Sequence, residues 1–388
     1  MKKILFPAAL ISILASSGAT AFAYETTANH ALIMDNETGI VLFEKDAENP
    51  MVPASMTKIM TAYMVFERLS DGRLSEDDTF TVSERAWREG GWASGGSTMG
   101  LAIGSEVSVI DLLRGMIVQS GNDACIVLAE GISGSEEAFA AEMTARAQEL
   151  GLSTASFKNA TGLLAEDHEI SAYDLARLAD LVIQQFPEYY ALYNVRDFTW
   201  SGIRQPNRNP LLSRFQGADG LKTGHLEASG YGLVGSAIVD GERRTIVING
   251  LESESARAQE AERMMRSAFR EFSVATPYAA GDALGSVPVW LGSAETVGLV
   301  VDQDVQIGFE NASRRDLKAE IVLPASISAP VTAGDVVGSL IISNGDVVLA
   351  EYPVSAAESV SKKGLIARAF EGLATLIAPS SSPASAEG

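Results

Sequence analysis

Three short motifs with the residue types of serine-based acyl transfer lie in one order along the 388-residue chain. They are Ser55-Met56-Thr57-Lys58, Ser120-Gly121-Asn122 and Lys222-Thr223-Gly224. A serine hydroxyl becomes an effective nucleophile when a neighbouring base takes its proton. Residues three apart on a helix share a face, so Lys58 would lie beside Ser55. The spacing therefore predicts Ser55 as the nucleophile and Lys58 as its proton acceptor.

Lys58 can accept a proton only as the neutral amine, which requires its pKa to be lowered. Burial and a nearby positive charge both disfavour the charged form of a lysine. Lys222 of the third motif is the candidate for that nearby charge. Ser120 and Lys222 would then form a second Ser/Lys pair on the opposite wall of a cleft.

Each motif also has an ordinary structural explanation. Asn122 before Asp123 would cap a helix, and Lys222-Thr223-Gly224 would form an exposed turn. The S-x-x-K pattern occurs a second time, in Ser359-Val360-Ser361-Lys362, which we interpret as accidental. Ser55 is preferred because a long apolar helical run follows it and the other two motifs lie downstream. The ordered set of three motifs indicates an enzyme.

Composition and charge narrow the class of protein. The chain is 46% hydrophobic and 20% charged, which is typical of a soluble globular protein. Its formal net charge is −21, and it becomes −23 when residues 1–23, with two positive charges and no negative ones, are removed. Nucleic-acid binding needs clustered Lys and Arg, so no nucleic-acid partner is expected.

The first 23 residues have the pattern of a signal peptide. Lys2 and Lys3 precede a short apolar stretch, and Ala21-Phe22-Ala23 is a small-x-small cleavage site. We predict export and a mature chain that starts at Tyr24, with an uncleaved anchor as the alternative. Cys125 is the single cysteine, so no intramolecular disulfide is possible, and its apolar neighbours indicate a buried structural thiol.

Residues 24–278 have the pattern of an α+β domain. A turn at residues 36–39 divides the alternating segment 31–45, which predicts a β-hairpin. Strand patterns return at 230–239 and 245–250. Strands at both ends of the segment predict one antiparallel sheet packed against a helical lobe. The helices expected between and after the strands cover residues 55–69, 109–118, 123–131, 135–150, 172–185 and 255–272.

Residues 279–357 alternate apolar and polar positions without a helical period, which predicts a small all-β domain. Residues 358–388 complete the chain. From Lys362 to Ile377, large apolar residues recur at a spacing of three to four, with cations nearby. This pattern predicts an amphipathic helix on a membrane surface, or one that packs on the protein's own β-domain. Beyond Pro379 the chain is Ser- and Ala-rich, which favours disorder.

The histidines do not form a metal-binding pattern. His30, His168 and His225 are the only three, and the consecutive residues around His168 cannot all point inward. We therefore expect no metal and no cofactor. A Ser-His-Asp triad is not needed, because Lys58 supplies the base.

The motifs and their neighbours, in residues 53–61, 120–125 and 219–225, resemble the low-molecular-mass penicillin-binding D-alanyl-D-alanine carboxypeptidases. The resemblance implies a β-lactamase/transpeptidase-like catalytic domain, a non-catalytic β-domain and a C-terminal amphipathic helix. The implied substrate is the D-Ala-D-Ala terminus of peptidoglycan stem peptides, and β-lactam antibiotics are the implied covalent ligands. The implied location is the periplasm, with peripheral attachment to the inner membrane's outer face.

The resemblance also assigns roles around the scissile bond. Ser55 would form the acyl-enzyme and Lys58 would accept its proton. Ser120 would relay a proton to the leaving D-alanine, and Asn122 would hold the peptide amide. The backbone N–H groups of Ser55 and His225 would form the oxyanion hole.

A second group of residues would bind the rest of the substrate. Lys222 and Thr223 would receive the terminal carboxylate, and Gly224 completes their motif. Arg208 and Arg257 match family arginines near the carboxylate pocket, with surface salt bridges as their alternative role.

Three segments depart from the family pattern. Leu226 stands where the family usually has threonine, so a hydroxyl that would help the carboxylate pocket is absent. Residues 159–163 lack the His-Gly often found there, and residues 92–98 form a Gly/Ser-rich loop beside the cleft. Each departure could change the fit of the substrate. Gly121 also replaces the aspartate usual in β-lactamases.

Other functions remain compatible with the same motifs. A β-lactamase needs a deacylating base, and Glu166 lies in the right interval although its neighbours do not match. A DD-endopeptidase would need open space beyond the carboxylate pocket. A non-catalytic wall-binding protein would have degraded motifs, and labelling with penicillin separates it from the enzymes.

Overall fold

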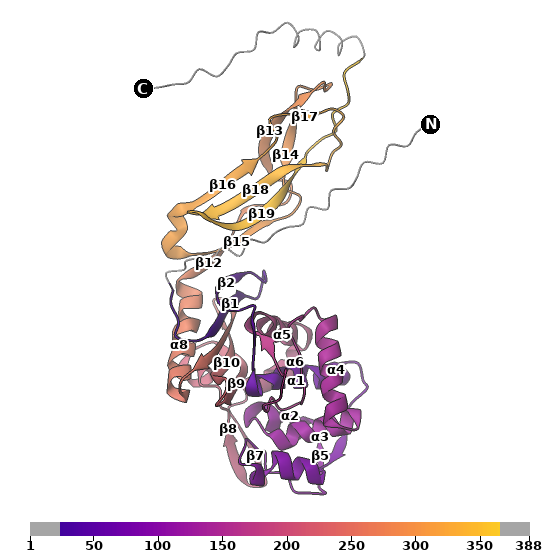
Figure 1. The fold of residues 1–388 in the computed structure, drawn as a ribbon, viewed down its shortest axis with the longest axis vertical. Helices are drawn as coiled ribbons and strands as arrows, with labels where there is room; N and C mark the ends of the chain where they lie inside the picture. Colours follow the sequence, from indigo (N-terminus) through magenta and orange to yellow (C-terminus); the bar gives the residue numbers. More distant parts are fainter. Residues whose placement is uncertain (1–23, 365–388) are drawn as a thin grey trace, which may run out of the picture. The chain divides into compact units, whose positions relative to one another are not determined.

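The computed structural model describes residues 24–364, which divide into two compact units. The larger unit contains Tyr24–Ala275 and Gly308–Ala312, and the smaller unit contains Thr276–Ile307 and residues 313–364. The predicted signal peptide lies outside the described residues, as does the predicted amphipathic helix from residue 365 onward. Figure 1 labels the helices and strands.

A five-stranded antiparallel sheet forms the centre of the larger unit. Its strand order is β2-β1-β11-β10-β9, so the N-terminal hairpin pairs with strands from the end of the unit, as predicted. The N-terminal hairpin is therefore confirmed. The strands are β1 (His30–Asp35), β2 (Val41–Lys45), β9 (Ala218–Leu226), β10 (Gly230–Val239) and β11 (Glu242–Leu251).

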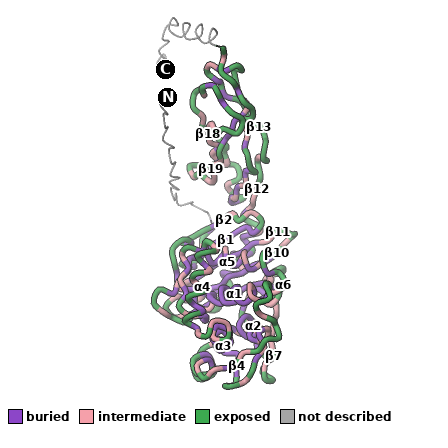
Figure 2. The backbone as a smooth tube through the Cα atoms, turned by 90° about the vertical axis from the view of Figure 1, so that its right-hand side faces the viewer, coloured by how far each residue is buried: buried purple, intermediate pink, exposed green. Residues whose placement is uncertain are grey.

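Helices cover both faces of this sheet (Figure 1). The alternation of a strand sends Leu32 and Met34 into the core of the helical lobe, while the intervening Ile33 is buried on the other face. That other face is covered by α8 (Glu254–Arg270), whose Met264 and Met265 are buried. The sheet is therefore apolar on both sides, and Figure 2 shows buried residues, in purple, on its strands and on the helices α1, α2 and α5.

The helical lobe lies between β2 and β9 in the sequence. The predicted bounds of α2 and α5 agree with the structure to the residue. The segment 55–69 is instead a 3₁₀ turn, η1 (Ala54–Thr57), that leads into an α-helix. Serine side chains cap α2, α4, α5 and α8 at their N-termini. The helices are α1 (Lys58–Ser70), α2 (Val109–Val118), α3 (Asn122–Ser133), α4 (Glu136–Glu149), α5 (Ala172–Gln185), α6 (Pro187–Tyr190) and α7 (Leu211–Arg214).

Short elements complete the larger unit. Three two-stranded ladders join loops of the lobe: β3 (Pro50–Met51) with β6 (Ile170–Ser171), β4 (Thr79–Thr81) with β5 (Glu106–Ser108), and β7 (Asp197–Trp200) with β8 (Ile203–Pro206). The remaining short helices are η2 (Ala86–Gly90), η3 (Trp92–Ser94) and η4 (Ala191–Asn194).

The smaller unit is built of strands, which confirms the predicted all-β character of this region. Its main sheet has the order β16-β18-β19-β14-β13-β17. Lys362 forms a bridge with Gly292, so the helix predicted to begin at Lys362 does not include that residue. The elements that lie wholly in this unit are β13 (Ala283–Trp290), β14 (Thr296–Val300), β16 (Leu317–Val322), β17 (Ile327–Ser328), β18 (Val336–Asn344) and β19 (Val347–Ala356). Three further elements each include residues of both units: β12 (Phe272–Tyr278), β15 (Val305–Glu310) and η5 (Asn311–Asp316).

Candidate active site

The first motif lies where η1 passes into α1. Nζ of Lys58 lies 3.1 Å from Oγ of Ser55, which is the spacing of a hydrogen bond. Ala54, immediately before the serine, has a positive φ of 50°. A non-glycine residue in this region of backbone space is strained, and such strain concentrates at functional sites. The local fold therefore holds the serine and the lysine side by side, as their spacing predicted.

Lys58 is almost completely buried, with 1% of its surface exposed. Besides Ser55, its Nζ donates to Oδ1 of Asn122 at 2.9 Å and to the backbone oxygen of Thr161 at 2.6 Å. Burial lowers the pKa of Lys58 below its ordinary value, and the positive charge of Arg208 lowers it further. A lysine in this environment is suited to accept a proton.

The second motif lies at the start of α3. Ser120 has a positive φ of 68°, and its Oγ is buried without a hydrogen-bond partner among the described residues. Asn122 is the first residue of α3, but its side chain does not cap the helix. The carboxylate of Asp123 instead accepts hydrogen bonds from the backbone N–H groups of residues 99–101. This carboxylate fixes the loop before the motif to the helix.

The third motif lies inside β9, an edge strand of the central sheet, and not in an exposed turn before a strand. Lys222 and Thr223 are buried, while His225 is exposed. Nζ of Lys222 lies 3.2 Å from the backbone oxygen of Thr223. Gly224 packs against the segment before the nucleophile, because a Cβ there would lie 2.7 Å from the backbone oxygen of Pro53. The absence of a side chain thus lets β9 approach η1.

The two arginines singled out in the sequence, one in the loop between β8 and α7 and one on α8, both line the cavity at the motifs. Arg208 donates to Oγ of Ser97 at 2.6 Å. Arg257, on α8, is 4% exposed and lies over the ring of Tyr231, with its guanidinium carbon 5.7 Å from the ring centre. It also pairs with Glu254 at 3.1 Å. Arg257 is thus a buried residue, and its role is not limited to a salt bridge on the surface.

A cavity of about 270 Å³ lies in front of Ser55 and between the three motifs. We call it the serine cavity. Lys58, Asn122 and Lys222 are buried and do not line it. The residues that line it are Ser55, Ser97, Ser120, Arg208, Thr223, Gly224, His225, Tyr231, Glu254 and Arg257. The structure therefore brings all the predicted site residues to one place.

The two buried lysines repel each other when both are charged. Burial lowers the pKa of Lys222 well below its ordinary value, and repulsion from Lys58 lowers it further. Because this repulsion acts on both partners, Lys222 also disfavours the charged form of Lys58. Arg208, which the sequence did not indicate for this role, is a further cation that lowers the pKa of Lys58.

Two residues that position the site, Glu136 and His168, were not recognised from the sequence. Glu136 accepts a hydrogen bond from the backbone N–H of Ala160 at 3.0 Å, which fixes the loop whose next carbonyl contacts Lys58. His168 lies 2.9 Å from Oγ1 of Thr57. Acidic side chains are rarely buried, so a buried glutamate or histidine can mark a structural role. The sequence could not show this role here, because the partners are backbone groups and a hydroxyl that lie far away in the sequence.

The ring of His168 has a defined tautomer. Its Nδ1 accepts a hydrogen bond from the backbone N–H of Lys158, so Nε2 carries the proton and donates it to Thr57. Burial lowers the pKa of His168 to about 4. The imidazole is therefore neutral at pH 7 and connects Thr57 to the loop of residues 158–168.

Of the three departures from the family pattern, one supplies a residue that lines the serine cavity. The Gly/Ser-rich loop contributes Ser97, which contacts Arg208. Leu226 follows His225 on β9 but does not line the cavity, and neither do residues 159–163. Glu166 is exposed and lies outside the cavity lining.

Within residues 24–364, no group of three potential ligands of a metal ion occurs. In the same residues, no helix is long and apolar enough to cross a membrane.

Comparisons with known proteins agree with this geometry. Residues 17–252 match the family model described as D-alanyl-D-alanine carboxypeptidase, and residues 272–362 match that of the penicillin-binding protein 5 C-terminal domain. D-alanyl-D-alanine carboxypeptidase DacD of Salmonella typhimurium is 38% identical over 341 residues, which cover 87% of each chain. DacF of Bacillus subtilis is 35% identical over 345 residues, again 87% of each. The crystal structure of DacD from Francisella tularensis has a TM-score of 0.79 and 31% identity, covering 88% of this chain and 95% of that one.

A serine and a buried lysine between an antiparallel sheet and a helical lobe define a serine acyl-transfer enzyme. The chain belongs to the D-alanyl-D-alanine carboxypeptidase family, and it is a serine-type enzyme of that class. The family predicted from the three motifs is thereby confirmed.

Proposed function

We propose that the protein removes the terminal D-alanine of peptidoglycan stem peptides through an acyl-enzyme on Ser55. One observation carries this proposal: the three contacts of Lys58 Nζ. A neutral amine has two N–H groups and one lone pair. Thr161 and Asn122 offer oxygen acceptors for the two N–H groups, so the lone pair faces the hydroxyl of Ser55. Deprotonating Lys58 therefore makes it the base for the serine.

The acylation step follows from this arrangement. Lys58 takes the hydroxyl proton while Oγ of Ser55 bonds to the carbonyl carbon of the penultimate D-alanine. The oxyanion is stabilised by the backbone N–H groups of Ser55 and His225, a type of contact worth about 2.7–4 kcal/mol per donor. The C–N bond then breaks, and Ser120 relays the proton held by Lys58 to the leaving amine, so both side chains return to their starting protonation states. Its buried, unpartnered hydroxyl is available for that transfer.

The cations around the serine cavity select a substrate with a free C-terminal carboxylate. Arg208 and Arg257 line the cavity, and Thr223 presents a hydroxyl from β9. Asn122 would hold the peptide amide beside Ser55. Water then attacks the acyl-enzyme and releases the shortened peptide. Penicillins would acylate the same serine. The covalent adduct would persist because ring opening leaves both fragments in one molecule.

We also propose an arrangement for the parts of the chain around the catalytic domain. Residues 1–23 would be a signal peptide, 24–278 the catalytic domain, 279–357 the β-domain and 358–388 the membrane-associating tail. The enzyme would act in the periplasm, attached to the outer face of the inner membrane through the tail. Cell fractionation of the full chain and of a chain ending at residue 364 tests this attachment. Retention of the shortened chain on the membrane would contradict it.

The decisive experiment measures D-alanine released from Nα,Nε-diacetyl-Lys-D-Ala-D-Ala by the purified protein, Ser55→Ala and Ser359→Ala. Ser359 is a matched control, since it begins the second S-x-x-K pattern and its Oγ accepts a hydrogen bond from Ala333 in the smaller unit. We expect D-alanine to be released only by the wild type and Ser359→Ala. The same two proteins should form a covalent adduct with penicillin, and Ser55→Ala should not. Release by Ser55→Ala would refute the assigned nucleophile.

A further inference from the structure

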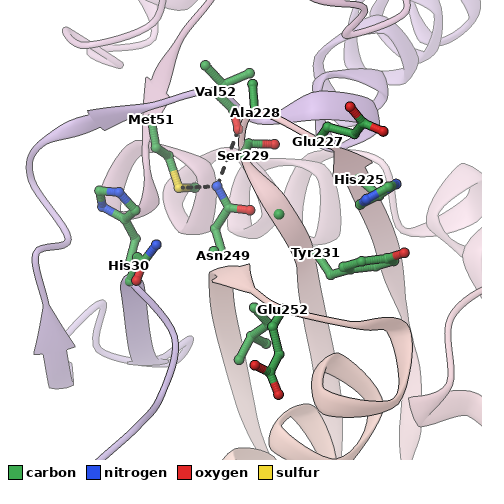
Figure 3. A pocket seen from close by; sticks show the side chains of 14 residues that line it. His30, Met51, Val52, His225, Glu227, Ala228, Ser229, Tyr231, Asn249 and Glu252 are labelled. Carbon is green, nitrogen blue, oxygen red and sulfur yellow. Dashed lines mark hydrogen bonds between the residues drawn. The ribbon is translucent and has the colours of Figure 1, made fainter.

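A second cavity, of about 700 Å³, adjoins the serine cavity in the larger unit. We call it the adjoining cavity. It lies at the end of the sheet, around the turn between β9 and β10 and the end of β11 (Figure 3). His225 and Tyr231 line both cavities. Their rings are stacked with centres 3.8 Å apart, and the two residues are paired across β9 and β10. This stacked pair is therefore the boundary between the two spaces.

The two cavities differ in charge. The charged residues that line the serine cavity are two arginines, Arg208 and Arg257, and one glutamate, Glu254, so positive charge is in excess there. The adjoining cavity is lined by Glu227 and Glu252, which are both exposed, and by no lysine or arginine among the described residues around it. His30 also lines it, but its Nδ1 lies 3.1 Å from the carboxylate of Asp46. A ligand that occupied both spaces would be anionic at one end and cationic at the other.

An amide oxygen at the wall of the adjoining cavity is placed to accept a hydrogen bond. Asn249 is 3% exposed, and its Nδ2 donates to the backbone oxygen of Val52 at 3.3 Å and contacts Sδ of Met51 at 3.1 Å. These contacts direct its Oδ1 toward the side of the cavity where Tyr231 lies (Figure 3). Oγ of Ser229, another lining residue, is buried without a partner among the described residues. Because buried polar atoms are normally paired, this wall suits a ligand with several donors.

We propose that the adjoining cavity binds a primary ammonium group carried by the substrate upstream of its D-Ala-D-Ala terminus. This inference rests on the proposed function. An ammonium supplies three donors and one positive charge, which match Asn249 Oδ1 and the carboxylates of Glu227 and Glu252. The terminal carboxylate and the scissile bond occupy the serine cavity, so the side chain of the preceding residue extends past His225. A stem peptide with a free side-chain amine would then be preferred.

The test compares two peptides that differ only in that amine. Nα-acetyl-Lys-D-Ala-D-Ala keeps the ε-ammonium, and Nα,Nε-diacetyl-Lys-D-Ala-D-Ala lacks it. We expect the wild type to favour the free amine in kcat/KM by about two- to fivefold for each carboxylate, mainly through KM, with less preference at high salt. The double variant Glu227→Gln/Glu252→Gln should lose this preference.

A matched double variant controls for general charge effects. Glu76 and Glu188 are exposed glutamates outside both cavities, so Glu76→Gln/Glu188→Gln should retain the wild-type ratio. Equal kcat/KM for the two peptides with wild-type protein, or an unchanged ratio in Glu227→Gln/Glu252→Gln, would overturn the ammonium subsite. The proposed function would stand in both cases, since it fails only if neither peptide is cleaved.

Discussion

The backbone oxygen of Thr161 lies 2.6 Å from Nζ of Lys58, which is shorter than either side-chain contact of this lysine. The loop that carries this oxygen would therefore take part in the proton transfer that we propose for Lys58, although it contributes no side chain to it. Glu136 holds the loop through Ala160, and His168 connects it to Thr57. The pKa of Lys58 and the position of Ser55 should both respond to changes in these supporting groups.

Removing the carboxylate behind the loop should change the pH profile. The charge of Glu136 raises the pKa of Lys58, so Glu136→Ala should lower that pKa and move the acid limb of kcat/KM to lower pH. The unpaired N–H of Ala160 should also cost about 1–3 kcal/mol of stability. The control is Glu137→Ala, an exposed neighbour that pairs with the same Arg85. An acid limb that stays in place in Glu136→Ala contradicts the prediction.

Removing the cation in front of the lysine should have the opposite effect. Arg208 lowers the pKa of Lys58, so Arg208→Gln should raise it and move the acid limb to higher pH, by up to about one pH unit. The measurement is the pH dependence of D-alanine release. The quantity to compare is the pH at which the acid limb falls, and not the maximal rate. Arg204→Gln, which removes an exposed arginine paired with Asp197, should leave the limb unchanged. A shift of equal size in both variants would refute a local effect.

The buried histidine should make stability depend on pH. The pKa of His168 is about 4 in the folded chain, against an ordinary value near 6.5. As the pH falls, the unfolded chain therefore binds the extra proton first. The contribution of His168 to the stability of the folded chain is present above pH 6.5 and is lost as the pH falls toward 4. We expect unfolding at pH 5 to require about 2 kcal/mol less than at pH 7. In urea titrations, His168→Gln should reduce this difference and His30→Gln should not; equal behaviour would disprove the assignment.

A methyl group in the loop should displace the nucleophile. Gly162 has a φ of +79°, and a Cβ there would lie 1.8 Å from the backbone oxygen of Ala54. Gly162→Ala should therefore shift Ser55 and slow acylation by penicillin by about a hundredfold. Gly39 has a similar φ of +73° with open space around it, so Gly39→Ala tests the backbone effect alone. Stopped-flow acylation that is equally fast in both variants would show that the contact does not position the serine.

Much of this architecture follows from patterns in the sequence, and the exceptions have physical causes. The helices α2 and α5 were predicted to the residue because their apolar positions repeat at the helical period. The strand β9 was missed, since Gly220, Lys222 and Gly224 lack the apolar alternation of a strand. Its lysine is buried by neighbours that are distant in sequence. The contact from Thr161 was unpredictable for a different reason, because any residue type offers a backbone oxygen.

The single thiol of the chain is enclosed near Lys58. Cys125 is fully buried and donates to the backbone oxygen of Gly121, and burial raises its pKa to about 12. A thiol in this state is a poor nucleophile toward alkylating probes. A cysteine introduced at an exposed position, such as Ser201, would therefore react almost alone. The native chain is thus ready for site-specific fluorophore attachment without prior removal of its own cysteine.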